Sequence, residues 1–140
     1  MSIYILDTDT ITLQQANRRT ILRHLERIPP TQVFTTVITM REQIRGRLAI
    51  VDQAEEGAAL VKAYAQLQAT MDYFKQVRVL PFTEDALTCL HQLRIQKVRV
   101  GTQDLRIAAI ALSVDGILVT SNRRDFAKVP ELSIEDWNVA

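Results

Sequence analysis

An apolar run near the N-terminus stops abruptly at acids in the segment Ile3-Tyr4-Ile5-Leu6-Asp7-Thr8-Asp9. Consecutive apolar residues that end in a polar turn are typical of a strand buried on both faces. Such strands belong to parallel sheets covered by helices, so the segment predicts an α/β fold. It also leaves Asp7 at the carboxyl end of the first strand.

Similar apolar runs recur along the chain, separated by segments with helical spacing. The further predicted strands are Val33–Ile38, Val77–Leu80, Ile117–Thr120 and an edge strand, Leu132–Trp137. The predicted helices run from an N-cap at about Asn17 to Ile28, from Met40 to Leu48, from about Gln53 to Lys75, from a cap at Thr83, and from a cap at Thr102 through the buried segment Ile107–Leu112. This alternation predicts a single domain over residues 1–140, a three-layer α/β/α sandwich with a central, mainly parallel sheet.

The longest predicted helix carries a narrow apolar stripe. Its members follow one another at spacings of four and three residues: Leu60, Tyr64, Leu67, Met71 and Phe74. Core packing is the usual meaning of such a stripe. A partner or dimer surface is the alternative, because the helix is long enough to project from the domain.

Composition is that of an ordinary globular protein, with 47% hydrophobic and 24% charged residues. The single Cys89 cannot form an internal disulfide, which favours a reducing cytoplasm. The N-terminal residues show no secretory leader, and the apolar run Ile107–Leu112 is far shorter than the roughly 20 residues that span a bilayer. A cytoplasmic protein without a membrane segment is therefore expected.

Four acids are predicted to lie at one edge of the sheet, where strands end and helices begin. Asp7 follows the first strand, Glu42 lies in the helix after the second, Asp104 opens the buried helix, and Asp125 lies in the loop after Thr120. Ligands of such sheets bind at this carboxyl edge. Each acid alone could be a turn former, a partner of a helix dipole or a solvated residue. Together they would repel one another, which favours a bound cation.

Carboxylate oxygens without Cys or nearby His select hard cations, so Mg²⁺ or Mn²⁺ is the predicted cofactor. His24 and His91 fall in amphipathic helices away from the acidic edge and are expected to be surface or packing residues. A divalent ion among carboxylates can activate water and neutralise charge on a departing oxygen. Phosphodiester hydrolysis is therefore the predicted reaction class.

Arginines flank these acids, although the total charge is nearly balanced, with 17 Lys and Arg against 16 Asp and Glu. The flanking bases are Arg41, Arg45, Arg106, Arg123 and Arg124. Each alone is explained by a solvated helix face with local ion pairs. As a group they are candidates to bind an RNA backbone, because the guanidinium fork matches phosphate oxygens.

The chain resembles the PIN-domain nucleases, and in particular the VapC-type toxins of bacterial toxin–antitoxin pairs. The segments that carry the resemblance are Ile5-Leu6-Asp7-Thr8-Asp9, Thr36-Val37-Ile38-Thr39 with Glu42 and Gly46, Asp104-Leu105-Arg106-Ile107-Ala108-Ala109, and Leu118-Val119-Thr120-Ser121-Asn122 with Asp125-Phe126. They occur in the family's order and extend over almost the whole chain, from the first strand to Trp137. Four motifs in this order are specific, whereas any one alone is weak.

The resemblance implies a metal held mainly by Asp7 and Asp104 with support from Glu42. It also implies endonucleolytic cleavage of RNA, a homodimer, and inhibition by a small antitoxin that blocks the acidic groove. Thr120 and Asn122 are predicted to support the site.

Two positions depart from the family's pattern. Many relatives have an acid where Asn122 stands, so the fourth negative charge of this site must come from Asp125. Asn122 itself can still accept a hydrogen bond from water on a metal. Asp9 stands where relatives often have Asn, and we expect its role to be structural.

Two other functions remain as alternatives. The segment Asp7-Thr8-Asp9-Thr10 also matches the nucleophile motif of haloacid-dehalogenase-like phosphatases, in which Asp7 would be a covalent nucleophile and Asp9 a general acid. Too little chain follows Ser121 to hold the later motifs of that family. The second alternative, which Asn122 permits, is a non-catalytic PIN scaffold that binds RNA or a protein.

Overall fold

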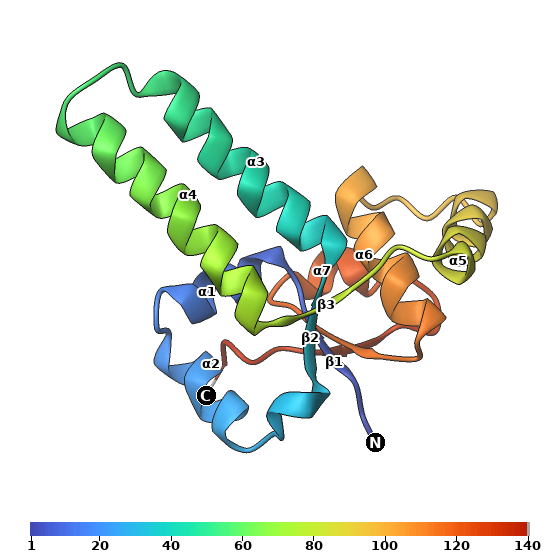
Figure 1. Ribbon diagram of the computed structural model, residues 1–140. Coiled ribbons are helices and arrows are strands. Elements are labelled where there is room, and N and C mark those ends of the chain that lie inside the picture. Colours follow the sequence, from blue (N-terminus) through green and yellow to red (C-terminus); the bar gives the residue numbers. More distant parts are fainter. Residues whose placement is uncertain (140) are drawn as a thin grey trace.

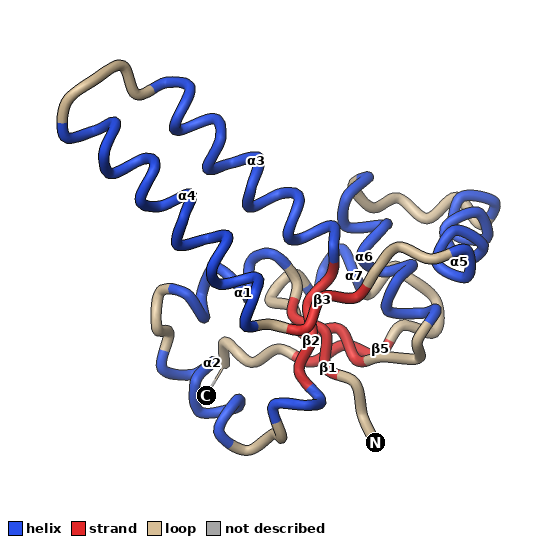
Figure 2. The backbone as a smooth tube through the Cα atoms, viewed as in Figure 1, coloured by secondary structure: helices blue, strands red, loops and turns tan. Residues whose placement is uncertain are grey.

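The computed structural model describes residues 1–139, and its centre is a five-stranded sheet with the order β3-β2-β1-β4-β5. Every neighbouring pair of strands in this sheet is parallel. The strands are β1 (Tyr4–Leu6), β2 (Val33–Thr36), β3 (Arg78–Leu80), β4 (Ile117–Val119) and β5 (Ser133–Glu135). Figure 2 shows them gathered at the centre with the helices outside. The predicted α/β fold with a parallel sheet is confirmed, including the short edge strand near the C-terminus.

Helices connect the strands and cover both faces of the sheet (Figure 1). They are α1 (Thr8–Gln15), α2 (Arg19–Glu26), a short 3-10 helix η1 (Pro30–Gln32), α3 (Val37–Gln53), α4 (Ala58–Gln76), α5 (Glu84–Ile95), α6 (Thr102–Ser113) and α7 (Arg123–Phe126). None of the helices within residues 1–139 is both long and apolar enough to cross a membrane.

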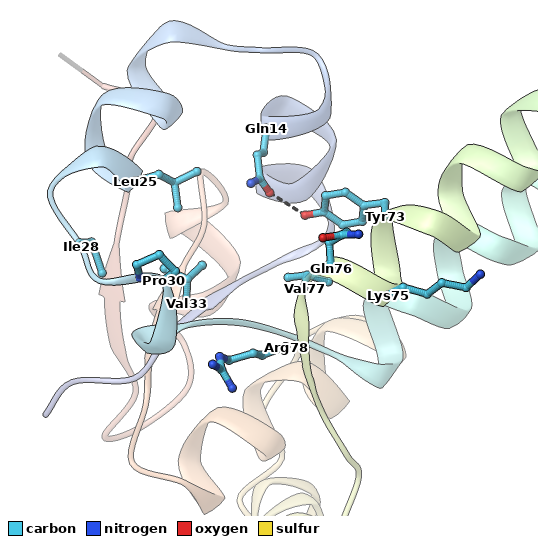
Figure 3. A pocket seen from close by; sticks show the side chains of 10 residues that line it. All are labelled: Gln14, Leu25, Ile28, Pro30, Val33, Tyr73, Lys75, Gln76, Val77 and Arg78. Carbon is cyan, nitrogen blue, oxygen red and sulfur yellow. Dashed lines mark hydrogen bonds between the residues drawn. The ribbon is translucent and has the colours of Figure 1, made fainter.

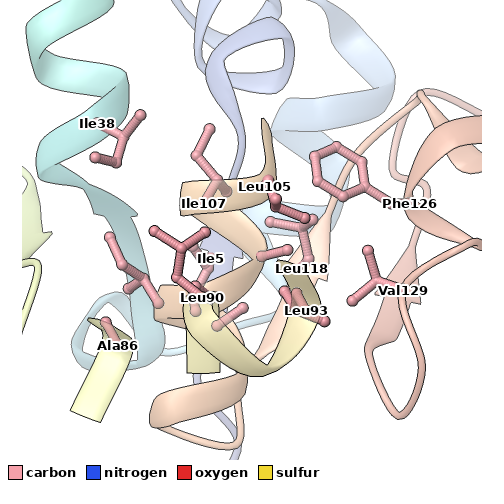
Figure 4. Packing of buried hydrophobic residues seen from close by; sticks show 14 residues of the cluster. Ile5, Ile38, Ala86, Leu90, Leu93, Leu105, Ile107, Leu118, Phe126 and Val129 are labelled. Atoms are coloured by element: carbon pink, nitrogen blue, oxygen red, sulfur yellow. The ribbon is translucent and has the colours of Figure 1, made fainter. Parts of the chain in front are cut away.

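Alternate residues of the central strands enter two different cores, which makes the three layers. Ile5 of β1 lies beside Leu118 of β4, and both pack with the buried faces of α5 and α6 (Figure 4). The next pair, Leu6 and Val119, packs on the opposite face with side chains of α1 and α2 and with Trp137. Apolar residues at consecutive positions are therefore needed in both strands, as expected for a sheet covered on both faces.

Helices α3 and α4 form a hairpin that projects from the domain (Figure 1). The buried residues of α4 are Ala63 and Thr70, seven positions apart, and Thr70 accepts a hydrogen bond of 3.0 Å from Nε of Arg47 on α3. The apolar stripe lies beside this contact line, so Tyr64 and Met71 are 55% and 43% exposed. The prediction of core packing is therefore wrong for these two residues. The small side chain of Ala63 is buried instead, at 2% exposure.

The N-terminal helix predicted from Asn17 is wrong at its start. Helix α1 follows Asp7 directly, and Asn17 lies between α1 and α2 with a φ of 59°, in the left-handed region that asparagine tolerates. Asn17 therefore ends α1 instead of starting α2: its amide donates to the Gln14 carbonyl at 2.9 Å, and the Arg18 amide donates to the Leu13 carbonyl at 2.9 Å. The sequence prediction missed α1 because Asp7 and Thr8 suggested a turn, whereas Asp7 is the N-cap of a helix.

Other boundaries also differ from the prediction: α3 is longer than the predicted Met40–Leu48, and α4 begins at Ala58, after the predicted start at about Gln53. Strand β2 ends at Thr36, whose hydroxyl caps α3 by accepting a 3.2 Å hydrogen bond from the Thr39 amide. Helix α6 begins at Thr102 itself after Gly101, with no side-chain cap, so Thr102 is not the predicted N-cap. Asp125, predicted in a loop, lies in α7. The predicted cap at Thr83 is confirmed by its 3.1 Å hydrogen bond from the Ala86 amide.

Candidate active site

Asp7 lies at the carboxyl end of β1 and caps the N-terminus of α1. Its Oδ1 accepts a 2.9 Å hydrogen bond from the Thr10 amide, and its own amide donates to the Val119 carbonyl at the end of β4. The side chain of Thr10 donates to the same carbonyl at 3.0 Å. Asp7 is thereby fixed between the two central strands, at the point where the chain order of the sheet reverses and where ligands of such sheets bind.

Burial sets the protonation behaviour of Asp7. The residue is only 4% exposed, and loss of hydration raises the pKa of its carboxyl group. Hydrogen bonds from Thr120 and Thr10 lower this pKa, but they do not offset the burial, and repulsion from Asp9 raises it further. The site therefore holds Asp7 where a negative charge is unfavourable without a nearby cation.

Glu42 lies in the second turn of α3 and reaches the start of α1. Its Oε1 accepts a hydrogen bond of 3.0 Å from the hydroxyl of Thr8, the residue after Asp7. The hydroxyl of Thr8 also lies 3.0 Å from that of Thr39, in the first turn of α3. These contacts join the second acid of the site to the first across two helices.

Asp104 lies in the first turn of α6 and is half-buried. Burial raises its pKa to about 6, together with repulsion from four other carboxylates. These carboxylates, in decreasing order of effect, are those of Asp7, Glu42, Asp9 and Asp125. The structure therefore brings the four predicted acids into one electrostatic environment, with Asp9 as a fifth member.

Asp125 differs from the other acids because its neighbours stabilise its charge. Asn122, the N-cap of α7, donates from Nδ2 to Oδ2 of Asp125 at 3.0 Å and accepts from its amide at 3.4 Å. Lys128 lies 3.6 Å from the same carboxylate. The pKa of Asp125 is lowered, first by the hydrogen bond from Asn122 and then by the charges of Lys128 and Arg124. Asn122 thus stabilises the charge of Asp125 through its side chain. Its backbone amide donates to the hydroxyl of Thr120 at 2.9 Å.

A family model described as the PIN domain matches residues 4–132. The chain belongs to the PIN-domain family. The match extends from β1 to the residue before β5, so it includes all four predicted motifs.

Relatives of this PIN domain are named as VapC nucleases. The ribonuclease VapC5 of Mycobacterium tuberculosis is 32% identical over 127 residues, which cover 88% of this chain and 84% of that protein. The tRNA(fMet)-specific endonuclease VapC of Salmonella typhimurium is 28% identical over 138 residues, which cover 96% of this chain and 97% of that protein. The predicted VapC type and ribonuclease class are confirmed, and the phosphatase alternative is not supported.

Solved structures share the fold over nearly the full chain. The structure of VapBC-1 from nontypeable Haemophilus influenzae has a TM-score of 0.77 and 25% identity, covering 98% of this chain and 99% of that one. A toxin–antitoxin complex from Klebsiella pneumoniae has a TM-score of 0.70 and 25% identity, covering 96% and 97%. The folds therefore correspond from end to end.

The acids of the PIN domain fit a hard divalent cation in chemistry. They offer carboxylate oxygens, and the raised pKa of Asp104 reflects burial together with repulsion from its neighbours, both of which a bound cation would offset. Within residues 1–139, no three Asp, Glu, His or Cys side chains converge closely enough to hold an ion by themselves. Mg²⁺ keeps several water ligands and takes one or two protein carboxylates, so a site centred on two acids suits it.

None of the five candidate arginines forms an ion pair with an acid of the site in the described part of the chain. Both ion pairs found in the described part of the chain involve lysines, Lys75 with Asp72 and Lys128 with Asp125. Arg106 is half-buried and donates to Oε1 of Gln103 at 3.4 Å. The other four arginines are exposed. Arg41 and Arg45 lie on α3, and Arg123 and Arg124 lie on α7. Their guanidinium groups are free to meet phosphate, and RNA binding by them stays a prediction.

Sequence reasoning missed three threonines of the site. Thr8, Thr10 and Thr39 use their hydroxyl groups to position Glu42 and the end of β4, as described above. Thr10 and Thr39 are fully buried. In the sequence, each of them is a hydroxyl-bearing residue in the first turn of a helix that follows a strand. That position is so common for helix capping that it did not distinguish them.

A separate pocket of about 540 Å³ lies at the opposite, amino edge of the sheet (Figure 3). It is lined by Val33 and Arg78, which begin β2 and β3, by Leu25 of α2 and by Ile28, which follows α2. Within it Tyr73 donates a 2.6 Å hydrogen bond to Gln14, and burial raises the pKa of this phenol to about 12. No acid of the site lines this pocket, so the pocket is separate from the acidic site.

The two predicted histidines lie away from the acids, as expected. His24 stacks on Trp137 with ring centroids 5.4 Å apart, and His91 is exposed on α5. Neither is available as a ligand beside the oxygens of the acidic groove.

Proposed function

We propose that this PIN-domain ribonuclease hydrolyses RNA phosphodiester bonds with Mg²⁺ or Mn²⁺ bound between Asp7 and Asp104. The observation that carries the proposal is the pKa of Asp104, raised to about 6 by burial and by four surrounding carboxylates. Separate elements of the fold deliver these charges to one edge. Such crowding is unfavourable by itself, and a divalent cation makes it favourable.

Each acid has a proposed role. Asp7 and Asp104 would provide the principal ligand oxygens for the ion, with support from Glu42. When bound, the divalent ion supplies positive charge that stabilises the phosphodiester transition state and favours deprotonation of an attacking water. Asp125 completes the catalytic set from the other side of the groove, where Asn122 orients it and Thr120 supports both.

The exposed arginines bind the RNA backbone beside the acids. Arg41 and Arg45 on α3 and Arg123 and Arg124 on α7 are solvent-accessible cations near an acidic groove that repels RNA. Arg106, one turn along α6 from Asp104, is the fifth candidate. Positive charge on either side of the groove is needed because phosphate must approach several carboxylates.

The chain is the toxin component of a toxin–antitoxin pair and acts as a homodimer. The likeness to a toxin–antitoxin complex over 96% of the chain supports a small antitoxin protein as partner. The antitoxin inhibits by covering the acidic groove. The test is to identify a short DNA-binding protein encoded next to the chain, to co-express the two, and to measure both co-purification and loss of RNA cleavage; absence of such a neighbour would contradict the pairing. Sedimentation of the chain alone tests the dimer.

The decisive experiment incubates the purified chain with total RNA in Mg²⁺, in Mn²⁺ and in chelator. Discrete fragments should form with either metal, disappear with chelator, and disappear in Asp7→Ala and Asp104→Ala. The matched control is Asp85→Ala, because Asp85 lies exposed in the first turn of α5, just as Asp104 lies in the first turn of α6. Cleavage that persists in both site variants places the chemistry elsewhere.

Calorimetry with Mn²⁺ separates this function from a non-catalytic PIN scaffold. The ribonuclease should bind Mn²⁺ and lose that binding in Asp104→Ala, whereas Asp85→Ala should bind as the wild type does. A chain that binds RNA without binding Mn²⁺ would be the scaffold.

A further inference from the structure

A series of three threonine hydroxyl groups leads from the N-terminus of α3 to the carboxylate of Glu42. The hydroxyl oxygens of Thr36 and Thr39 are 3.5 Å apart, those of Thr39 and Thr8 are 3.0 Å apart, and Thr8 lies 3.0 Å from Oε1 of Glu42. Thr36 and Thr39 are fully buried. This series of hydroxyl groups thus begins inside the protein and ends at an acid of the site.

Proton counting fixes the direction of these hydrogen bonds. A hydroxyl has one proton to donate, and an ionised carboxylate can only accept. Thr8 donates its proton to Glu42, so Thr39 must donate to Thr8. Because Thr39 has used its hydroxyl proton on Thr8, its oxygen can only accept from the Thr36 hydroxyl. The Thr36 oxygen in turn accepts from the Thr39 amide at 3.2 Å. Every donor in the series is therefore directed toward Glu42.

The bond from Thr8 acts against the repulsion within the site. Glu42 is half-buried on a flexible side chain, and its charge and that of Asp104 repel each other. Without a partner the carboxylate would turn toward solvent, because both repulsion and side-chain entropy favour that movement. Thr8 holds it toward Asp7, to which Thr8 is directly bonded in the chain.

We propose that Thr8 is a positioning residue for Glu42, with Thr39 fixing the direction of the Thr8 hydroxyl. This inference rests on the proposed metal-dependent ribonuclease function. The N-cap bond of α1 comes from Asp7, and the Thr8 hydroxyl makes no capping bond to the backbone. Removing that hydroxyl should therefore change the aim of Glu42 while α1 remains folded.

The test compares Thr8→Val, which keeps the branched shape without the hydroxyl, with Thr8→Ser, which keeps the hydroxyl. Thr8→Val should lower Mn²⁺ affinity by about 10- to 100-fold, the usual effect of losing a residue that orients a metal ligand. Thr8→Ser should bind Mn²⁺ nearly as the wild type does. The matched control is Thr88→Val, because the Thr88 hydroxyl on α5 only donates to the Glu84 carbonyl within its own helix.

A double-mutant comparison shows whether Thr8 acts through Glu42. In the Glu42→Gln background, Thr8→Val should cause little further loss of Mn²⁺ affinity or of single-turnover RNA cleavage, because residues of one network are not additive. Independent, multiplying losses would overturn the inference. Should Thr8→Val not fold, as judged by circular dichroism, Thr39→Val takes its place, with an expected loss of a few-fold.

Failure of this inference and failure of the function are distinguishable. A wild type that binds Mn²⁺ and cleaves RNA, with Thr8→Val equal to it, overturns the role of Thr8 alone. A wild type that neither binds Mn²⁺ nor cleaves RNA overturns the proposed function and this inference with it.

Discussion

The two ends of the acidic site affect the charge of a carboxylate in opposite ways. At one end the pKa of Asp104 is raised to about 6 and that of Asp7 is also raised, because both are buried among like charges. At the other end the pKa of Asp125 is lowered, because Asn122 and Lys128 stabilise its charge. An acid that already has its own partners gains less from a cation than one that has none. The comparison supports the proposed centre of metal binding at Asp7 and Asp104.

The largest expected effect of this difference is on catalysis. Asp104→Asn should lower the single-turnover rate of RNA cleavage by about 1000-fold, because a divalent ion contributes several kcal/mol to the transition state and loses a principal ligand. Asp125→Asn should lower it by no more than about 10-fold, as its charge is already balanced within the protein. Both rates are measured with saturating protein at pH 7.5. Equal losses in the two variants would contradict the comparison.

The second prediction concerns the pH dependence of metal binding. Protons compete with the ion for Asp104, so apparent Mn²⁺ affinity should fall about tenfold for each pH unit below about 6. Asp125 should remain ionised over the same range because its pKa is lowered. Calorimetric titrations from pH 5 to 8 measure this. A profile that is flat between pH 5 and 7 would show that Asp104 is not the ligand that titrates.

The third prediction concerns the partner of Asp125. Asn122→Ala removes both the cap of α7 and the hydrogen bond to the carboxylate, so it should lower the free energy of unfolding by about 1 kcal/mol. The pKa of Asp125 should rise toward its ordinary value, and RNA cleavage should change by only a few-fold. Urea unfolding with chelator present measures the stability. A loss of cleavage as large as that of Asp104→Asn would move the catalytic centre toward α7.

The strands and the acids at their ends could be predicted from the sequence, because each is a local pattern. Short runs of consecutive apolar residues such as Ile3–Leu6 indicate strands buried on both faces. The shared edge of Asp7 and Asp104 follows from the parallel topology. The start of α1 could not be predicted in this way. Whether Asp7 begins a turn or caps a helix depends on Thr10 contacting the end of β4, more than one hundred residues away.

The opposed behaviour of Asp104 and Asp125 was also beyond sequence reasoning. Both are single acids near the start of a helix, and the sequence gives no measure of burial for either. Asn122 could be recognised as a departure from the family's pattern, but its two hydrogen bonds to Asp125 depend on the short helix α7, which has only four residues. The apolar stripe on α4 shows the same limit, since spacing alone did not tell which side faces α3.

The smallest expected effect is a gain in stability. In chelator, folded Asp104 keeps its proton up to about pH 6, whereas in the unfolded chain it loses the proton near the ordinary pKa of 3.8. The folded state therefore binds more protons between these values, so the stability from this group falls as pH rises from about 4 to about 6 and stays low above pH 6.

Asp104→Asn should abolish this loss. It should make the metal-free protein more stable at pH 7 by no more than about 1 kcal/mol, since the half-exposed side chain is screened by solvent. The repulsion must also exceed the favourable effect of the α6 dipole on a negative charge in its first turn. Urea unfolding at pH 4.5 and pH 7 measures the difference. With Mn²⁺ present the wild type should be the more stable of the two proteins, because only the wild type gains free energy of unfolding from binding the ion. Asp104→Asn therefore stabilises only the metal-free protein.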